Sequence, residues 1–545
     1  MSSTHEVTNQ VPPLVGHDPI AGDTALVEAC LRHADELTLD SLEELGALAG
    51  SEQAAEWGRL ANENPPRLRT HDRTGHRVDE VEFHPAWHEL MGAAVGHGLA
   101  GAPWALADDP EHPDPHAHVR RAVGYLGWTQ VEMGHACPVT MTYAVVPALR
   151  RAPELAVVFE RGLTSTSYEA GLADPRTKAG LVAGMGMTEK QGGSDVRASN
   201  TRAVAQPDGT YALTGHKWFT SAPMSDLFLV LAQLEEGVSC FLVPRMLPDG
   251  DRNVFRLQRL KDKLGDRSNA SSEVEFDGTA GWLVGEPGRG VPAILEMVAT
   301  TRLDCVLGSA ATVRAALTQA LHHARHREAF GARLVDQPLM QNVLADLAVE
   351  SEAATALAIR LAAAQDAGEA DFLRLAGAAA KFAVCKRTPT VVAEALEVLG
   401  GNGYVEESVL PRLYRQAPLN SIWEGSGNVI ALDVLRAMDR RSESAEAVLA
   451  EIEAATGADD RYDTAAARLH AELADPEQLP FRARRVAELL ALCLQGSLLL
   501  QHAPGAVADA FCATRLGGDW GSVLGTLPAG TATTEIVDRA VVAPA

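Results

Sequence analysis

The sequence predicts an α+β protein that is mostly helical, with a β-rich part between helical ones. Residues up to about 180 have the pattern of helices with Pro-rich interruptions, the next hundred or so change to strand-like runs, and helical spacing returns after Gly290. We therefore expect four domains: an N-terminal helical domain (1–180), a middle β-domain (181–288), a helical bundle (289–440) and an added C-terminal helical domain (441–545).

Short apolar runs indicate the strands of the middle domain. Residues 226–233 and 238–244 are two such runs, and residues 272–276 alternate between polar and apolar side chains, as a half-buried strand does. The Pro207-Asp208-Gly209 segment supplies a turn between two alternating segments.

Apolar residues at helical spacing indicate the bundle. One face is formed by residues three, four or a multiple of these steps apart: Val343, Leu347, Ala354, Leu357 and Leu361. A helix that begins near Ala378 is expected to end at Gly400 and Gly401, and further helices follow Arg440.

Charge narrows the possible functions. The 545 residues include 47 basic and 72 acidic side chains, so the net charge is 47 − 72 = −25. Binding of a phosphate polymer would therefore need a local basic patch.

Several features predict a cytoplasmic protein without metal or membrane contact. The seven cysteines form no Cys-x-x-Cys pair, which indicates reduced thiols, and the N-terminal residues lack the basic and apolar regions of a secretory signal. The longest apolar stretch, Val486–Leu500, is shorter than the roughly 20 residues of a membrane helix. His112, His116 and His118 lie in a Pro-rich loop without ordered ligand spacing, so we expect no metal there.

The first segment with candidate chemistry is Gly186–Asp195, which contains Met187, Thr188 and a Gly-Gly-Ser turn that ends at Ser194. The backbone N–H groups of such a turn can approach an anion or a ring edge, and the Thr188 hydroxyl can donate to a carbonyl. A plain surface turn can also contain Gly-Gly-Ser.

Two further segments suit a nucleotide cofactor. Arg327 precedes Phe330, and its guanidinium matches phosphate oxygens, although a surface salt bridge is the common alternative. The Gly400–Gly403 turn leaves backbone open to a ligand, but a lone Gly-Gly-x-Gly is a weak signal.

The remaining two segments centre on tryptophans. Trp218 and Thr220 lie in a predicted strand, where a half-buried tryptophan is more often a core residue than a cofactor contact. Glu424 lies between Trp423 and Gly425, and apolar cover from Trp423 would suit a general base.

Together these segments resemble the acyl-CoA dehydrogenase superfamily. The match is specific over Gly186–Asp195 and from Glu397 to Arg412, with Gln416 as a mild departure. The resemblance implies the acyl-CoA dehydrogenase fold, in which an N-terminal helical domain, a middle β-barrel domain and a C-terminal four-helix bundle follow one another. Here an extra helical domain is added at the C-terminal side.

The resemblance also implies FAD as the cofactor and assigns residues to it. These are Met185, Met187, Thr188, Ser194, Trp218, Thr220, Arg327, Phe330, Gln337, Gln341, Gly400, Gly401, Gly403 and Trp423. In the family the arginine that matches Arg327 binds the FAD pyrophosphate of a neighbouring subunit, which implies a homo-oligomer, expected to be a tetramer.

Glu424 is the catalytic base that the resemblance implies. The other position that the family uses for its base is occupied by Thr301, which cannot take a proton, and the adjacent Arg302 is assigned to the substrate. Glu424 would remove the α-proton of a small acyl thioester while FAD takes the β-hydride, and an electron acceptor of unknown identity would reoxidise the flavin.

Other segments, among them Phe83–His88 and Cys137–Thr142, resemble the alkylation-response (AidB-type) branch of the superfamily. That branch binds FAD, has feeble activity toward short branched acyl-CoAs such as isovaleryl-CoA, and is associated with protection of DNA from alkylation. Its DNA contact is attributed to a basic C-terminal region. Residues 441–545 here contain 8 basic and 15 acidic side chains, a net of −7, so charge disfavours DNA.

Three functions follow as alternatives. The chain is an FAD-dependent oxidoreductase of the CH–CH bond of a short or branched acyl thioester, a DNA-associated flavoprotein that protects against alkylation, or a flavin enzyme of specialised metabolism. The third stays open because one fold can host many substrates.

Overall fold

The computed structural model describes residues 4–440 and 442–543 and divides the chain into two compact units. The barrel unit is Gln53–Asp304, and the bundle unit combines Met1–Glu52 with Cys305–Ala545. In sequence, the barrel unit is thus an insertion in the bundle unit.

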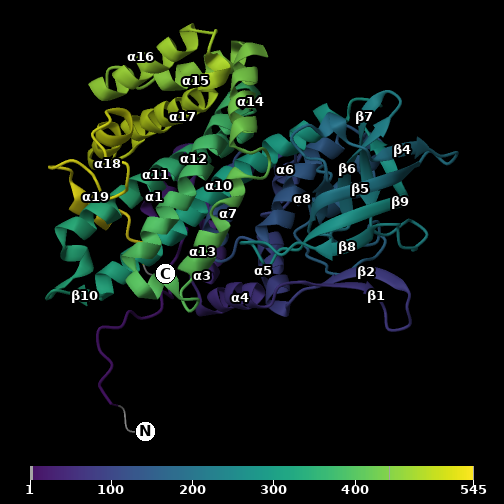
Figure 1. Ribbon diagram of the computed structural model, residues 1–545, viewed down its shortest axis with the longest axis horizontal. Coiled ribbons are helices and arrows are strands. Elements are labelled where there is room, and N and C mark those ends of the chain that lie inside the picture. The colour runs from purple at the N-terminus through teal and green to yellow at the C-terminus, as the bar shows by residue number, and fades with distance from the viewer. Residues whose placement is uncertain (1–3, 441, 544–545) are drawn as a thin grey trace. The chain divides into compact units, whose positions relative to one another are not determined.

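Five strands of the barrel unit close into a barrel, in the order β6, β7, β9, β5, β4 and back to β6. They are β4 (Arg202–Ala205), β5 (Tyr211–Ser221), β6 (Leu227–Leu234), β7 (Gly237–Pro244) and β9 (Ser271–Val284). The ring closes through the parallel pair of Arg202 and Gln233. β3 (Ala183–Gly186) runs parallel to β6. β8 (Arg256–Leu260) pairs with β9 and runs antiparallel to it (Figure 1).

The barrel core explains why two strands could be read from the sequence. Phe228, Phe241, Phe255 and Phe276 are buried together in it. The two predicted apolar runs form β6 and β7, whose residues are buried on both faces over most of their length, so they lack polar alternation.

Helices and a β-hairpin complete the barrel unit. The hairpin is β1 (Arg67–His71) with β2 (Arg77–Glu82), and the helices are α4 (Glu52–Glu63), α5 (Pro85–Gly96), α6 (Ala102–Ala107), α7 (Ala117–Trp128), α8 (Ala136–Leu149) and α9 (Pro153–Leu163). A buried ion pair joins Arg121 to Asp304, with both N–O distances 2.6 Å, and the Thr140 hydroxyl donates to the same carboxylate at 2.7 Å. Buried charges need such partners.

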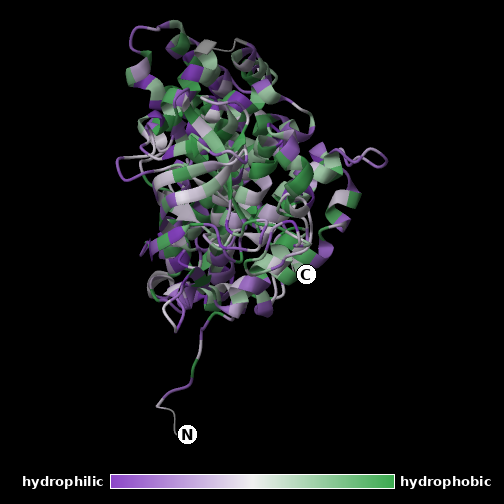
Figure 2. Cartoon of the chain, turned by 90° about the vertical axis from the view of Figure 1, so that its right-hand side faces the viewer, coloured by the Kyte–Doolittle hydropathy of each residue, from purple (hydrophilic) through white to green (hydrophobic). Residues whose placement is uncertain are grey.

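Long helices dominate the bundle unit. Its main helices are α10 (Gly290–His326, which begins in the barrel unit), α11 (Pro338–Asp366), α12 (Ala370–Val398) and α14 (Gly427–Arg440). Shorter helices of the same unit are α1 (Thr24–His33), α2 (Glu36–Asp40), α3 (Glu43–Ala49) and α13 (Leu410–Gln416). The sequence predicted that α12 begins near Ala378, but it begins at Ala370. Gly368, with φ +67°, separates α11 from α12, and α12 starts two residues after this glycine. Hydrophobic and hydrophilic residues share individual helices, as amphipathic packing requires (Figure 2).

The C-terminal extension consists of α15 (Ser442–Glu453), α16 (Asp460–Ala474), α17 (Leu479–His502), α18 (Gly505–Phe511), the π-helical turn η5 (Cys512–Leu516) and α19 (Thr533–Arg539). α17 packs on α12 and α14, and α19 packs on α11 (Figure 1). The mostly helical α+β class is therefore confirmed.

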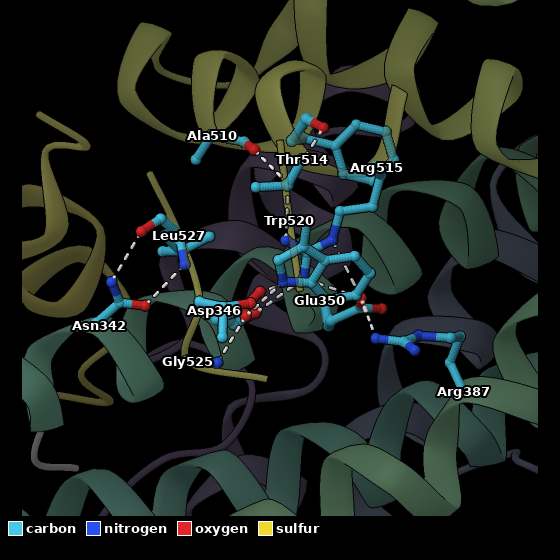
Figure 3. A network of polar contacts seen from close by, with 12 residues as sticks. Asn342, Asp346, Glu350, Arg387, Ala510, Thr514, Arg515, Trp520, Gly525 and Leu527 are labelled. Atoms are coloured by element: carbon cyan, nitrogen blue, oxygen red, sulfur yellow. Dashed lines mark hydrogen bonds and ion pairs between the residues drawn. The ribbon is translucent and has the colours of Figure 1, made fainter. Parts of the chain in front are cut away.

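A buried polar network fastens the extension to α11 (Figure 3). Asp346 is fully buried and accepts hydrogen bonds from the Trp520 indole N–H at 3.0 Å and the Gly525 N–H at 2.8 Å. Its ion pair with Arg515 measures 2.5 Å, and the Trp520 ring lies between Arg515 and Arg387, 4.2 and 5.0 Å from their guanidinium carbons.

Contacts between the first and last parts of the chain close the bundle unit. The N–H of Ala543 donates to the Gly22 carbonyl at 3.1 Å, and the Asp18 N–H donates to the Ala543 carbonyl at 3.4 Å. Arg539 adds ion pairs with Glu28 on α1 and Glu352 on α11.

Across residues 4–440 and 442–543, none of the helices has the length and apolar character needed to span a bilayer. All seven cysteines are buried thiols without a disulfide.

Replacing Asp346 by Ala is expected to lower the free energy of unfolding by roughly 2–6 kcal/mol, since the N–H groups of Trp520 and Gly525 would each lose their acceptor at about 1–3 kcal/mol, while Arg515 would keep its ion pair with Glu350. The midpoint and slope of urea unfolding measure this loss. Arg59→Ala, which removes exposed ion pairs with Glu56 and Glu63, is the control and should leave stability close to that of wild type. Equal stabilities of the two variants would contradict the prediction.

Candidate functional site

The segment after β3 is anchored by Glu189, which is 1% exposed. Its carboxylate accepts hydrogen bonds from Lys217 Nζ at 2.8 Å, from the Thr201 hydroxyl at 2.6 Å and from the Asn200 N–H at 2.6 Å. Burial acts to raise the pKa of Glu189, but these hydrogen bonds, with that from Lys217 foremost, outweigh it and lower the pKa to about 2. Glu189 is therefore a charged structural anchor, a role that the sequence analysis missed.

This anchor places Thr188 beside β5. The Trp218 N–H donates to the Thr188 carbonyl at 2.7 Å, so two of the predicted cofactor residues lie side by side. Gly193 leaves room for the Thr188 side chain, because a Cβ at this position would lie 2.3 Å from the Thr188 hydroxyl oxygen.

Thr220 supplies an unsatisfied group in the same strand. Its hydroxyl oxygen is buried and has no hydrogen-bond partner among the described residues. An unpaired buried hydroxyl is costly, which favours an additional partner at this place. Met185 and Met187, on and just after β3, are half-buried, whereas Ser194 is exposed.

Basic groups surround the Trp218 ring. Lys261 Nζ lies 3.3 Å from the ring centroid, and Lys190 and Arg259 lie 5.6 and 5.7 Å from it. Glu273 holds Lys261 and Arg259 with contacts of 2.6 Å each. The indole is thus fixed by cation–π contacts in a positively charged environment.

In the bundle unit, Arg327 lies at the base of a tight hairpin. The hairpin pairs β10 (Glu328–Ala329) with β11 (Ala332–Arg333), and Phe330 at its tip has φ +54° and is fully exposed. Gln337 donates to the Ala329 carbonyl at 2.9 Å and so belongs to the same cluster.

A segment before the first helix also reaches this hairpin. The Asn9 side chain donates to the Glu328 carbonyl and accepts from the Glu328 N–H, each at 2.8 Å, while Arg327 donates to the Asn9 carbonyl. Gln341 instead faces α19, where its side-chain oxygen lies 3.4 Å from the hydroxyls of Thr533 and Thr534.

The glycine turn after α12 has two different parts. Gly400 has φ +59°, and a Cβ at Gly400 or Gly401 would meet nothing within 4 Å, so the backbone there is open to a ligand. A Cβ at Gly403 would lie 2.2 Å from the Leu396 carbonyl oxygen, so Gly403 is needed by the fold itself.

Glu424 lies in the loop between the 3₁₀ turn η4 (Leu419–Ser421) and α14, and it is half-buried. Its φ is +56°, an uncommon left-handed conformation for a residue other than glycine. The Trp423 indole N–H donates to the Asn420 side chain at 2.8 Å. Such outliers concentrate at functional sites.

The alternative base position lies on the part of α10 that belongs to the barrel unit. Thr301 is buried, its hydroxyl donates to the Val298 carbonyl at 3.1 Å, and the neighbouring Arg302 is half-buried. Within the described residues, no group of three or more His, Cys, Asp or Glu side chains could hold a metal ion.

Family models match most of the chain between residues 9 and 438. The model "Adaptive response protein AidB N-terminal domain" matches residues 9–170, "Acyl-CoA dehydrogenase, middle domain" matches 184–279, and "Acyl-CoA dehydrogenase, C-terminal domain" matches 288–438. The chain is also 46% identical, over 94% of each sequence, to AidB of Escherichia coli (strain K12). The chain belongs to the acyl-CoA dehydrogenase family, in its AidB branch. The predicted resemblance is confirmed.

Solved structures of the family agree with the fold. The structure of Caenorhabditis elegans ACDH-11 in complex with C11-CoA has a TM-score of 0.84 at 26% identity and covers 94% of this chain and 93% of its own. The apo form of Bd2924 has a TM-score of 0.82 at 27% identity and covers 91% of this chain and 100% of its own. Both matches cover more than nine tenths of the chain, so they include at least part of the C-terminal extension.

Glu189→Gln should destabilise the protein at neutral pH, because buried Lys217 loses its counter-charge; breaking a buried pair in this way costs roughly 3–5 kcal/mol. Because the folded-state pKa of Glu189 is lowered to about 2, its contribution is complete above the ordinary carboxyl range and is lost as the pH falls toward 2. Thermal melting between pH 3 and pH 7 should therefore show a difference between wild type and variant that shrinks in acid.

The matched control is the double variant Glu189→Gln/Lys217→Met, which removes both charges and should recover part of the stability. A constant difference across this pH range, or no recovery in the double variant, would show that the ion pair is not what holds this segment.

Proposed function

We propose that the chain is an FAD-dependent dehydrogenase of a short or branched acyl thioester, with Glu424 as the base. The observation that carries the proposal is the conformation of Glu424, a carboxylate presented on a left-handed turn between Trp423 and Gly425. The family to which the chain belongs supports the reaction class, oxidation of a CH–CH bond next to a thioester.

The residues present suit FAD, the cofactor of the family. On the barrel unit, the unpaired Thr220 hydroxyl and the adjacent Thr188 and Trp218 would contact the flavin. On the bundle unit, Arg327 would bind the pyrophosphate, and the open backbone at Gly400 would lie against the dinucleotide.

In the proposed reaction, the Glu424 carboxylate takes the proton from the carbon next to the thioester carbonyl, and a double bond forms as a hydride leaves the next carbon. When bound, FAD supplies the acceptor for that hydride. Arg302 is assigned to the substrate. The fixed turn holds the carboxylate in one orientation, which lowers the reorganisation needed for proton transfer. The nematode ACDH-11 structure contains C11-CoA, which supports an acyl thioester as the ligand class.

A homo-oligomer, proposed to be a tetramer, would complete the site. Phe330, Leu339 and Tyr404 are 101%, 85% and 83% exposed, which leaves them available for contact with a second copy of the chain. They lie on the Arg327 hairpin, at the start of α11 and in the glycine turn, so a second copy of the chain would cover the segments assigned to FAD. An electron acceptor must then remove two electrons in each turnover.

The ion pairs of the arginines in the C-terminal extension disfavour DNA association. Arg482 and Arg485 both pair with Glu472, and Arg461 pairs with Asp459 and Asp509. Because these positive charges are neutralised locally, they form a poor surface for a phosphate backbone.

Arg327→Ala should weaken FAD binding by about 10- to 100-fold, since a charge-assisted hydrogen bond is worth roughly 1.5–3 kcal/mol. Titration of the apoprotein with FAD, followed by flavin fluorescence, measures this change. Arg325→Ala, an exposed arginine at the same helix end, is the control and should bind FAD like wild type. If wild type fails to bind FAD at all, the proposed function is wrong.

Glu424→Gln should keep FAD but lose substrate-dependent flavin reduction, because the amide cannot accept the α-proton. Loss of a general base costs on the order of 10²–10⁴ in rate. Single-turnover bleaching with acyl-CoAs from isovaleryl-CoA to C11-CoA is the measurement, and it also separates short branched substrates from longer ones. Equal rates in wild type and variant would show that Glu424 is not the base.

A further inference from the structure

A lysine is buried in the middle of α12. Lys381 is 1% exposed and lies in the apolar run from Ala378 to Cys385. A charged group in such surroundings is unfavourable unless it gains strong hydrogen bonds. Its ammonium donates to the Trp423 carbonyl at 2.8 Å and to the Gly425 carbonyl.

These two acceptors are the main-chain carbonyls on either side of Glu424. The loop adopts left-handed conformations at consecutive positions, with φ +56° at Glu424 and +105° at Gly425. A non-glycine residue stays in this region only where its surroundings enforce it. The two hydrogen bonds from Lys381 supply this enforcement, because they fix the carbonyls before and after the turn.

We propose that Lys381 is the positioning residue for Glu424, holding the left-handed turn so that the carboxylate is presented in one orientation. This inference rests on the proposed role of Glu424 as the base. Lys381 itself takes no part in proton transfer.

The chemistry of lysine suits the task. A single ammonium has three donors on a flexible stem and can bind two carbonyls that face different directions, whereas a planar guanidinium requires a fixed fork. A methionine at this position would keep the apolar stem but leave both carbonyls without their donor.

A second anchor holds the beginning of the same loop. The Trp423 indole is bonded to Asn420, and the Asn420 amide donates in turn to the Ser309 hydroxyl at 3.2 Å. These bonds precede Glu424, whereas Lys381 also binds the Gly425 side of the turn, so the loss of Lys381 should free the turn without detaching the whole loop.

The same helix offers a matched control. Arg374, two turns before Lys381 on α12, pairs with Asp433 on α14 at 2.8 and 3.0 Å. Arg374→Met removes a charged contact between α12 and α14 but leaves the Glu424 turn intact.

The test compares the flavin-loaded variants Lys381→Met, Arg374→Met and Glu424→Gln, with isovaleryl-CoA and C11-CoA as probes. Lys381→Met should slow single-turnover flavin bleaching on the order of 10²-fold, the effect of a small misplacement of a reacting group. Its flavin content and the acyl-CoA concentration at half-maximal rate should stay near those of wild type, and Arg374→Met should bleach like wild type.

A second readout does not depend on the substrate. Hydrogen exchange of the peptide that covers residues 420–428 should be faster in Lys381→Met than in wild type or Arg374→Met. If Lys381→Met does not fold, Lys381→Gln, which keeps one amide donor group, should give intermediate exchange and an intermediate bleaching rate.

The outcomes separate this inference from the function on which it rests. If Glu424→Gln stops bleaching while Lys381→Met (or, if that variant does not fold, Lys381→Gln) matches wild type in rate and exchange, Lys381 is not the positioning residue. If Glu424→Gln bleaches normally, the proposed base is wrong. In that case unchanged exchange in Lys381→Met would also overturn the structural part of the inference.

Discussion

The segments that carry Thr188 and Glu424 share one constraint: their main chain leaves regular structure, so its buried polar groups need other partners. Buried or inward-facing side chains supply these partners. Glu189 accepts from the N–H groups of Asn200 and Thr201, and Lys381 donates to the carbonyls that flank Glu424. The candidate catalytic and cofactor segments are thus held by charged side chains that need not touch a ligand themselves.

The sequence was informative where a pattern is local. The runs that form β6 and β7 are continuous in apolar residues because both faces are buried, and the Glu424 and Gly400 motifs are read from neighbouring positions. Local patterns could not predict the closure of the barrel, because it depends on the pairing of Arg202 with Gln233, which are 31 residues apart in the sequence. The start of α12 was placed too late because the role of Gly368 as a helix break was overlooked.

The anchors were missed for a related reason. The side chain of a glutamate or a lysine is normally exposed to solvent, so neither residue was expected to be buried. The partners of Glu189 and Lys381 are also distant in sequence, so no local pattern indicates them. One signal was available for Lys381: it interrupts an alanine-rich stretch whose other residues are apolar. A lone charge in such a stretch is worth examining as a buried group, because its desolvation must be balanced by specific contacts.

The contacts that join Gly22 and Asp18 to Ala543 have a consequence for how the protein is made. During translation, the complete barrel unit, Gln53–Asp304, is synthesised before the second part of the bundle unit, which begins at Cys305. Domains generally fold as units during synthesis. The first 52 residues therefore wait for partners that are made after the barrel unit, first α11 and last Ala543. A premature stop near the C-terminus would leave a finished barrel attached to an unclosed bundle.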